Sequence, residues 1–397
     1  MNKNNKVVLA FSGGLDTSYC VKYLTLEKGL EVHTALVNTG GFTKEELHET
    51  TRRARSLGAK RHVNLERTEA FYSKAIKYLI YGNILKNHTY PLSVSSERVF
   101  QAVAIAEYAK EIGASYIAHG STGAGNDQVR FDIVFNILTP DLEIITPIRD
   151  QQLSRKDEIE YLKENGLDIP WEKARYSINK GLWGTSVGGS ETLTSHLPLP
   201  DDAFPTQLTE KQSISVKLNF AQGELVGIDD QKYKPVDAIR SLNEMASNYA
   251  IGRDIHVGDT IIGIKGRVGF EAAGPMIVIK AHEALEKHNL TKWQIYWKEQ
   301  LANWYGMLLH EGQYLDPVMR NIEKFLEDTQ VTVSGSVMVK LNPYHFNVAG
   351  ISSDHDLMQS KFGDYGEVNN AWSGEDVRGF TKILANQTKI YHAVNGA

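Results

Sequence analysis

The sequence predicts an α/β domain built on a parallel sheet, followed by an α+β domain and a C-terminal oligomerisation helix. The first part of the chain alternates short apolar runs with longer segments of helical period, which is typical of a parallel sheet covered by helices. The second part gathers several strand-like runs around one long helical stretch. At 397 residues the chain exceeds the roughly 250–300 residues that one core organises well. We therefore predict domains at residues 1–168 and 169–365 and a tail at 366–397.

In the first domain, predicted strands alternate with predicted helices. The strands are expected at residues 6–11, 31–38, 60–65 and 115–120, and the helices at 16–29, at 43–58, in a long stretch after residue 65 and at 96–113. In open parallel sheets, ligands bind beyond the carboxyl ends of the strands. We therefore expect the site in the loops that follow VVLAF and YIAHG.

The second domain is expected to begin after a looser passage between Pro147 and Pro205. Strands are expected at 213–220, 224–229, 259–266 and 276–282, a helical stretch at 283–310, and a hairpin from 331–341 and 344–353. Residues 374–393 form an amphipathic pattern with no evident core of their own. We expect this helix to pack on a neighbouring subunit.

Composition excludes several classes of function. A formal net charge of -5 gives no long-range attraction to a nucleic acid, so no nucleic-acid partner is expected. The opening residues contain neither a signal peptide nor a membrane span, and the single Cys20 suits a reduced compartment, so we expect a cytoplasmic protein. Cys20 itself is expected to pack in the core. The 13 histidines show no HxH or HExxH spacing, so no metal site is expected on the protein.

The segment SGGLDTS, residues 12–18, lies between a predicted strand and a predicted helix. Its glycines permit close backbone approach, its N–H groups can form an anion nest, and the helix N-terminus adds partial positive charge. A polyphosphate fits such a loop, whereas an ordinary strand–turn–helix with Ser or Asp as the N-cap is the alternative. The loop lacks the lysine of a Walker motif, which serves transfer of the γ-phosphate.

A second loop, residues 119–131, combines three glycines with Thr122, Asn126, Asp127 and Arg130. Backbone donors, an amide, a carboxylate and a guanidinium can together bind a small zwitterionic ligand. The alternative is that Asp127 and Arg130 only pair with each other at the surface.

The loop SGGLDTS resembles the signature of the ATP pyrophosphatase superfamily, and the whole chain resembles the argininosuccinate synthase family. Besides SGGLDTS, the motifs YPLSVS, GNDQVRF, TPIRD, YSINKGLWGTS and GDYGEV occur in that family's order. The resemblance implies an ATP-dependent ligase of arginine biosynthesis with an adenine nucleotide-binding domain and a synthetase domain. The ureido oxygen of citrulline would attack the α-phosphate of ATP, giving citrullyl-AMP and pyrophosphate. The amine of aspartate would then displace AMP.

The resemblance also implies roles for individual residues. ATP would contact Ala10, Phe11, Ser12, Gly13, Gly14, Leu15, Asp16, Thr17, Ser18, Val37 and Gly120. Aspartate would contact Thr122, Asn126 and Asp127, and citrulline Tyr90, Ser95, Asn126, Arg130, Ser177 and Ser186. Asp16, Asn126 and Asp127 are the residues expected to carry the chemistry. No general base is evident, Mg²⁺ is expected on the phosphates, and the family forms homotetramers.

Three positions depart from the family pattern: Ala124 in the second loop, and Gly258 and Phe270 where the family supplies a glutamate and a tyrosine to citrulline. Either Glu271 compensates and the substrate is free citrulline, or the substrate carries an acylated α-nitrogen. In the second case Lys265 and Arg267 would receive an acidic acyl chain. The rival functions are an RNA-modifying enzyme on the same phosphate loop and a nucleotide-binding module without activity.

Overall fold

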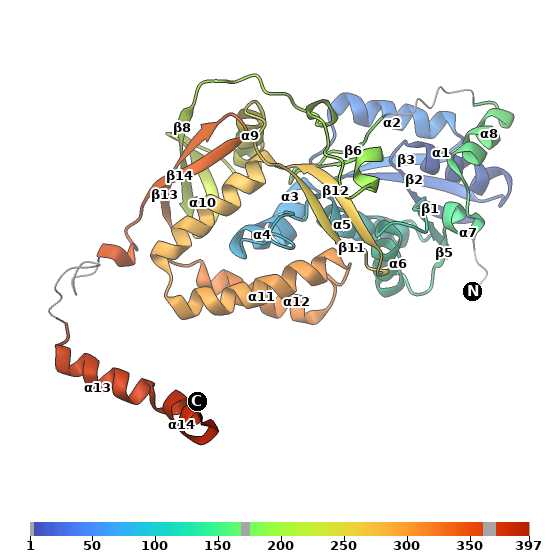
Figure 1. The fold of residues 1–397 in the computed structure, drawn as a ribbon. Helices are drawn as coiled ribbons and strands as arrows, with labels where there is room; N and C mark the ends of the chain where they lie inside the picture. Colours follow the sequence, from blue (N-terminus) through green and yellow to red (C-terminus); the bar gives the residue numbers. More distant parts are fainter. Residues whose placement is uncertain (1–3, 168–174, 360–370, 397) are drawn as a thin grey trace.

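The computed structural model describes residues 4–167, 175–359 and 371–396 (Figure 1). The predicted boundaries at 168/169 and 365/366 and the motif GDYGEV fall outside these ranges. The described chain forms a parallel-sheet body, a second body with two antiparallel sheets, and a helical tail that extends away from both. The predicted α/β and α+β classes are confirmed.

The N-terminal sheet has five strands in the order β3-β2-β1-β4-β5, all parallel. Their bounds are β1 Lys6–Ala10, β2 Glu31–Asn38, β3 Arg61–Glu66, β4 Tyr116–Ala118 and β5 Glu143–Ile145. The chain moves outward from β1 to β3 and returns to place β4 on the other side of β1. This reversal of strand order leaves a crevice at the carboxyl ends of β1 and β4, where such sheets bind ligands.

Alternation along β1 explains why both faces of this sheet are covered. Val7 and Leu9 pack in one apolar cluster with α1, whereas Val8 belongs to the larger cluster that includes α5. The helices that contact this sheet most are α1 Leu15–Leu26, α2 Lys44–Ser56 and α5 Ser93–Glu111. The other α-helices of this part of the chain are α3 Thr68–Phe71, α4 Lys77–Tyr81, α6 Asp127–Leu138, α7 Pro147–Gln151 and α8 Arg155–Glu164. Cys20 is fully buried in the first cluster, as predicted.

The second body contains a five-stranded antiparallel sheet and a four-stranded sheet. The first has the order β10-β9-β8-β13-β14, with β8 Ile214–Ala221, β9 Glu224–Ile228, β10 Gln231–Lys232, β13 Gly335–Asn342 and β14 His345–Ser352. The second has the order β11-β12-β7-β6, with β6 Ser177–Asn179, β7 Thr185–Gly188, β11 Arg253–Asp259 and β12 Lys265–Glu271. The predicted hairpin of 331–341 with 344–353 is confirmed as β13–β14.

Two predicted strands are wrong. Residues 276–282 lie in a helix, α10 Ala273–Asn289, and look strand-like because neighbouring positions such as Ile277, Val278 and Ile279 are all buried. Residues 259–266 form the end of β11, a turn and the start of β12. The predicted helical stretch 283–310 is also divided, because Thr291 caps a new helix, α11 Lys292–His310, through Gln294.

The remaining helices of the second body are α9 Pro235–Ser247 and α12 Pro317–Thr329. A buried polar network joins this body to the first, because His282 Nδ1 lies 2.6 Å from Asn83 Oδ1 and Lys298 Nζ donates to the carbonyl of Tyr81 at 2.9 Å. The larger apolar cluster likewise contains residues of both bodies. These buried contacts fix the second body against the first, beside the crevice of the N-terminal sheet.

The tail consists of α13 Gly374–Leu384 and α14 Asn386–Asn395. One helix was predicted for 374–393, and the structure breaks it at Ala385. Neither helix has a buried residue, and apolar side chains such as Phe380, Ile383 and Ile390 are exposed. The predicted packing on another subunit stays a prediction.

Candidate active site

A cavity of about 980 Å³ opens at the carboxyl ends of β1, β2 and β4, under the β11–β12 hairpin and beside β6 and β7. It brings together almost every residue expected at the site. The predicted residues that line it are Ala10, Phe11, Ser12, Gly14, Leu15, Asp16, Thr17, Val37, Tyr90, Ser95, Gly120, Thr122, Asn126, Asp127, Arg130, Ser177 and Ser186. Gly13 and Ser18 do not line it. The Ser18 hydroxyl is buried and donates to the Gly14 carbonyl at 2.7 Å.

The loop of residues 12–18 has the geometry of an anion site. Gly13 has φ +78°, a conformation that favours glycine, and its carbonyl accepts from Arg53 Nη1 at 2.6 Å. Gly14 is the N-cap of α1 and provides no side-chain cap, so the alternative of a Ser or Asp N-cap is wrong. Leu15, Asp16 and Thr17 of this first turn line the cavity, and the N-terminus of a helix suits an anionic group.

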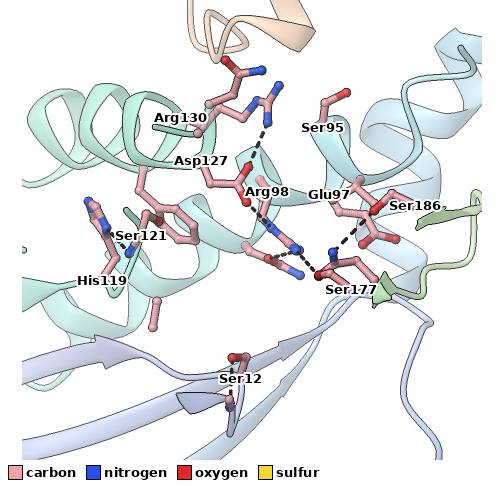
Figure 2. Close-up of a pocket in the computed structure, with 18 of the residues that line it drawn as sticks. Ser12, Ser95, Glu97, Arg98, His119, Ser121, Asp127, Arg130, Ser177 and Ser186 are labelled. Carbon is pink, nitrogen blue, oxygen red and sulfur yellow. Dashed lines mark hydrogen bonds and ion pairs between the residues drawn. The ribbon is translucent and has the colours of Figure 1, made fainter. Parts of the chain in front are cut away.

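Asp127 lies between two arginines at the centre of the cavity (Figure 2). Its Oδ2 is 3.0 Å from Arg98 Nε and its Oδ1 is 2.9 Å from Arg130 Nη1. Burial raises the pKa of Asp127, but the two guanidiniums outweigh that effect and the pKa is lowered. Asp127 and Arg130 therefore do pair, as the alternative reading supposed, but within the cavity, where the Arg130 side chain is only 5% exposed.

Arg98 was missed by the sequence analysis, because nothing in the helical segment around it distinguishes it from a surface arginine. Besides Asp127, it donates to Gln101 Oε1 at 3.0 Å and to Asn179 Oδ1 at 3.2 Å. Asn179 in turn contacts Ser186 Oγ at 3.5 Å. A chain of polar contacts thus runs from Asp127 in the second glycine-rich loop through Arg98 and Asn179 of β6 to Ser186 of β7.

His119 positions the start of the second loop. It is buried, its Nε2 lies 2.9 Å from Asp132 Oδ1, and its Nδ1 accepts from the Ser121 N–H at 3.2 Å. Arg149 Nη1 holds the other oxygen of Asp132 at 2.6 Å. The order Arg149–Asp132–His119–Ser121 fixes the tautomer of the imidazole and the direction of the loop backbone.

Asn126 joins the second loop to the hairpin above it. The backbone N–H of Ile261, in the turn between β11 and β12, donates to Asn126 Oδ1 at 2.8 Å. Asn126 also lines the cavity. Within the segment 259–266, wrongly predicted as one strand, residues 260–264 are thus the turn that closes the hairpin over the site.

The comparisons with known proteins cover nearly the whole chain. A family model described as the arginosuccinate synthase N-terminal HUP domain matches residues 6–168, and one described as the arginosuccinate synthase C-terminal domain matches residues 176–391. The argininosuccinate synthase of Methanocaldococcus jannaschii is 36% identical over 97% of this chain and 97% of its own length. That of Xanthomonas campestris is 36% identical over 98% of this chain and 98% of its own length. That of Pyrococcus furiosus is 33% identical over 98% of this chain and 95% of its own. The chain belongs to the argininosuccinate synthase family.

Membership of the argininosuccinate synthase family, a family of ligases, does not favour the RNA-modifying alternative or the N-acylated substrate. No helix in residues 4–167, 175–359 and 371–396 is long and apolar enough to cross a membrane. In the same ranges, no group of three or more His, Cys, Asp or Glu side chains is placed to hold a metal ion.

Ala124, Gly258 and Phe270, which depart from the argininosuccinate synthase pattern, lie in different surroundings. Ala124 is exposed and does not line the cavity, whereas Gly258 does. Phe270 is fully buried and its ring packs edge-on to Tyr90 at 5.5 Å between centroids. The hydroxyl that a tyrosine would carry there is therefore replaced by apolar packing behind Tyr90.

Glu271, expected to compensate for Gly258, and Lys265 and Arg267, expected to receive an acyl chain, all have partners within the protein. Glu271 is buried on the other side of β12, where it accepts from Thr206 Oγ1 at 2.7 Å and from Arg253 Nε at 3.0 Å. Lys265 pairs with Asp259 at 2.6 Å. Arg267 donates to the carbonyl groups of residues 191, 194 and 197. Both sequence-based explanations of this wall of the cavity therefore lack their proposed partner.

Glu97 also lines the cavity and was missed. It is buried on α5, and burial raises its pKa to about 8, although Arg98 opposes this rise. A side chain on Gly181 would overlap the carboxyl of Glu97, which explains why the KGLW segment has a glycine there. The sequence showed this glycine within a family motif but not what it approaches.

Proposed function

We propose that the protein condenses citrulline with aspartate at the expense of ATP, giving argininosuccinate, AMP and pyrophosphate. The observation that carries the proposal is one continuous cavity. It runs from the glycine-rich loop of residues 12–18, past Asn126, Asp127 and Arg130, to Ser177 and Ser186. Such a cavity can hold a nucleotide and two amino acids next to one another, as a two-step adenylylation requires.

The nucleotide would lie over β1 and β2, with its phosphates on the first turn of α1. The N–H groups there and the partial charge of the helix would stabilise the departing pyrophosphate. Since this loop has no Walker lysine, we infer cleavage between the α- and β-phosphates. Of the predicted ATP contacts, Ala10 to Ser18 with Val37 and Gly120, all line the cavity except Gly13 and Ser18. Gly13 would act through its backbone conformation.

Citrulline would bind with its ureido group toward Ser177 and Ser186 and its carboxylate toward Arg130. Serine hydroxyls can bond a neutral ureido group without charging it, and a guanidinium can hold a carboxylate. Ser95 and Tyr90 complete this side of the cavity. The ureido oxygen would then attack the α-phosphorus, which depends on positioning and on charge neutralisation rather than on a general base.

Aspartate would bind at the second loop, near Thr122, Asn126 and Asp127. Because Asp127 already accepts from Arg98 and Arg130, we infer that it acts largely by orienting these guanidiniums. Asn126 retains its amide N–H groups for a substrate carboxylate. The aspartate amine would then displace AMP from the activated ureido carbon.

Mg²⁺ fits the loop only as part of a metal–nucleotide complex, because the described residues offer no cage of ligands for it. Asp16, whose charge helps to raise the pKa of the buried Glu158 to about 8, is the carboxylate that would hold the ion together with phosphate oxygens. When bound, the ion would neutralise charge on the phosphates. We also propose a cytoplasmic homotetramer, in which the exposed apolar faces of α13 and α14 contact neighbouring subunits.

The products of ATP turnover test the proposal. With ATP, citrulline and aspartate, AMP and pyrophosphate should form in equal amounts. Stoichiometric ADP and phosphate would overturn it. Asp16→Ala and Gly14→Val should abolish turnover while leaving the thermal melt close to that of the unaltered protein, because both residues lie in a ligand-facing loop. Near-normal turnover in either variant would show that the loop does not hold the phosphates.

A further inference from the structure

We propose that His256 accepts a hydrogen bond from the α-ammonium of the substrate, and that the enzyme therefore takes citrulline with a free amine rather than an N-acylated one. The inference rests on the proposed function and adds to it the residue that selects the α-nitrogen. His256 is on β11, in the hairpin that covers the cavity, and it lines the cavity together with Gly258.

Strand geometry places His256 where a side chain at position 258 would lie. Residues 256 and 258 share one face of β11, and both are buried while Val257 and Asp259 are exposed. A Cβ on Gly258 would come 2.5 Å from His256 Nε2. The imidazole therefore occupies the space beside Gly258, and Gly258 is small because the ring is there.

The imidazole is held in place but lacks a partner of its own. His256 is 6% exposed and stacks on Tyr90, with 5.2 Å between the ring centroids. Its buried Nδ1 has no hydrogen-bond partner, and no described residue bonds Nε2. Nε2, the nitrogen beside Gly258, is therefore the one available to a ligand.

Burial and a nearby positive charge favour the neutral form of His256, which can accept a hydrogen bond. Burial and nearby Lys86 lower the pKa of His256, and Asp254 only partly opposes them. A neutral imidazole has one nitrogen free to accept, and an ammonium is a strong donor. The neighbouring His310 is less suitable, because its Nδ1 already faces Arg130 Nη2 at 3.4 Å.

No carboxylate near this wall competes for the ammonium. Asp127 is shared by Arg98 and Arg130, and Asp259 is paired with Lys265. Burial raises the pKa of Glu97 to about 8, which favours its neutral form. Among the described residues that line this end of the cavity, His256 is thus the side chain best able to receive the α-nitrogen. An acyl group on that nitrogen would have to displace the imidazole from the space beside Gly258.

The experiment compares kcat/KM for citrulline, N-acetylcitrulline and desamino-citrulline, which lacks the α-amine. The unaltered enzyme should prefer citrulline to both analogues. In His256→Ala, kcat/KM for citrulline should fall roughly 10- to 100-fold, mainly through KM, while that for desamino-citrulline stays within about threefold. His256→Gln, which keeps an acceptor, should retain most of the preference. His345→Ala, at an exposed histidine of β14, is the matched control.

A swap tests the shared space directly. Gly258→Glu alone should lose citrulline activity, because its Cβ meets the His256 ring, whereas the double variant His256→Ala/Gly258→Glu should recover the preference for citrulline. A preference of the unaltered enzyme for N-acetylcitrulline, or an equal loss for citrulline and desamino-citrulline in a folded His256→Ala variant, overturns the inference. If none of the three compounds supports pyrophosphate release with aspartate, the proposed function itself fails.

Discussion

Asp127 shows how one carboxylate can organise the side chains of a cavity by pairing with two guanidiniums. Arg98 and Arg130 approach it from α5 and α6, and without it two guanidiniums would face each other across the cavity. Arg130 is also anchored from its other side, since its Nε donates to the His310 carbonyl at 2.8 Å. The position of each guanidinium therefore depends on the charge at residue 127.

We predict that Asp127→Asn lowers kcat/KM for both amino acids, because it removes the charge that holds both arginines. The expected loss is about 1.5–3 kcal/mol in transition-state stabilisation. Asn126→Ala should weaken aspartate most and also loosen the hairpin turn at Ile261. Steady-state kinetics with each substrate varied in turn measures this, with the exposed Asp141→Asn as the control. Unchanged dependence on aspartate in both variants would remove these residues from its site.

Glu97 should make folding stability depend on pH. Its pKa is raised by burial from 4.5 to about 8, so between these values the native state holds a proton that the unfolded state has lost. Stability from this group is full below about pH 4.5 and is lost as the pH rises toward 8, with a slope of about 1.4 kcal/mol per pH unit. Denaturant unfolding at several pH values should therefore show a flatter profile for Glu97→Gln than for the unaltered protein. Parallel profiles would contradict the raised pKa.

At the scale of elements, the site depends on close approach between segments from the two bodies. The KGLW segment passes against α5, and the β11–β12 turn docks on the loop before α6. The Trp183 indole N–H donates to the Pro91 carbonyl at 2.8 Å, which fixes the same contact from the other side. A small residue is required where the KGLW segment meets α5, at Gly181.

Gly181→Ala should therefore destabilise the protein and reduce activity together. Its added Cβ would overlap the Glu97 carboxyl, and overpacking of this kind costs about 1–3 kcal/mol. Gly188→Ala is the matched control, because a Cβ there meets nothing within 4 Å. Urea denaturation and citrulline-dependent pyrophosphate release should both change in the first variant and neither in the second. A stable, active Gly181→Ala protein would show that Glu97 can move freely.

At the scale of the molecule, the two bodies share an apolar core and a buried polar network, whereas the tail contributes nothing to either. No residue of α13 or α14 is buried, and their apolar side chains face solvent in the isolated chain. Exposed apolar faces of this kind commonly mark sites of association.

Removal of residues 371–397 should consequently leave the body folded but reduce the size of the assembly. The melting temperature at high dilution should change little, since no core contact is lost. Sedimentation velocity should show a smaller species than the full chain, and Phe380→Asp/Ile383→Asp should behave in the same way. An unchanged sedimentation coefficient in both would exclude the tail from assembly.

The sequence by itself determined the parallel-sheet body, the glycine-rich loop of residues 12–18 and most residues of the cavity. These depend on local signals: apolar alternation for strands, glycines between a strand and a helix, and motifs in a fixed order. It also placed Cys20 in the core. It failed at residues 276–282, because a helix buried on several sides has the same run of apolar residues as a strand.

Only the tertiary structure decided which charges remain free in the cavity. Arg98, Glu97 and His256 carry no motif of their own, and each acquires its role from a partner far away in sequence, namely Asp127, Gly181 and Tyr90. The same reason removed Glu271, Lys265 and Arg267 from the substrate wall, since each is held by a neighbour that spacing cannot reveal. Residue type and spacing set what a side chain can bond, but folding sets which of those bonds are already made.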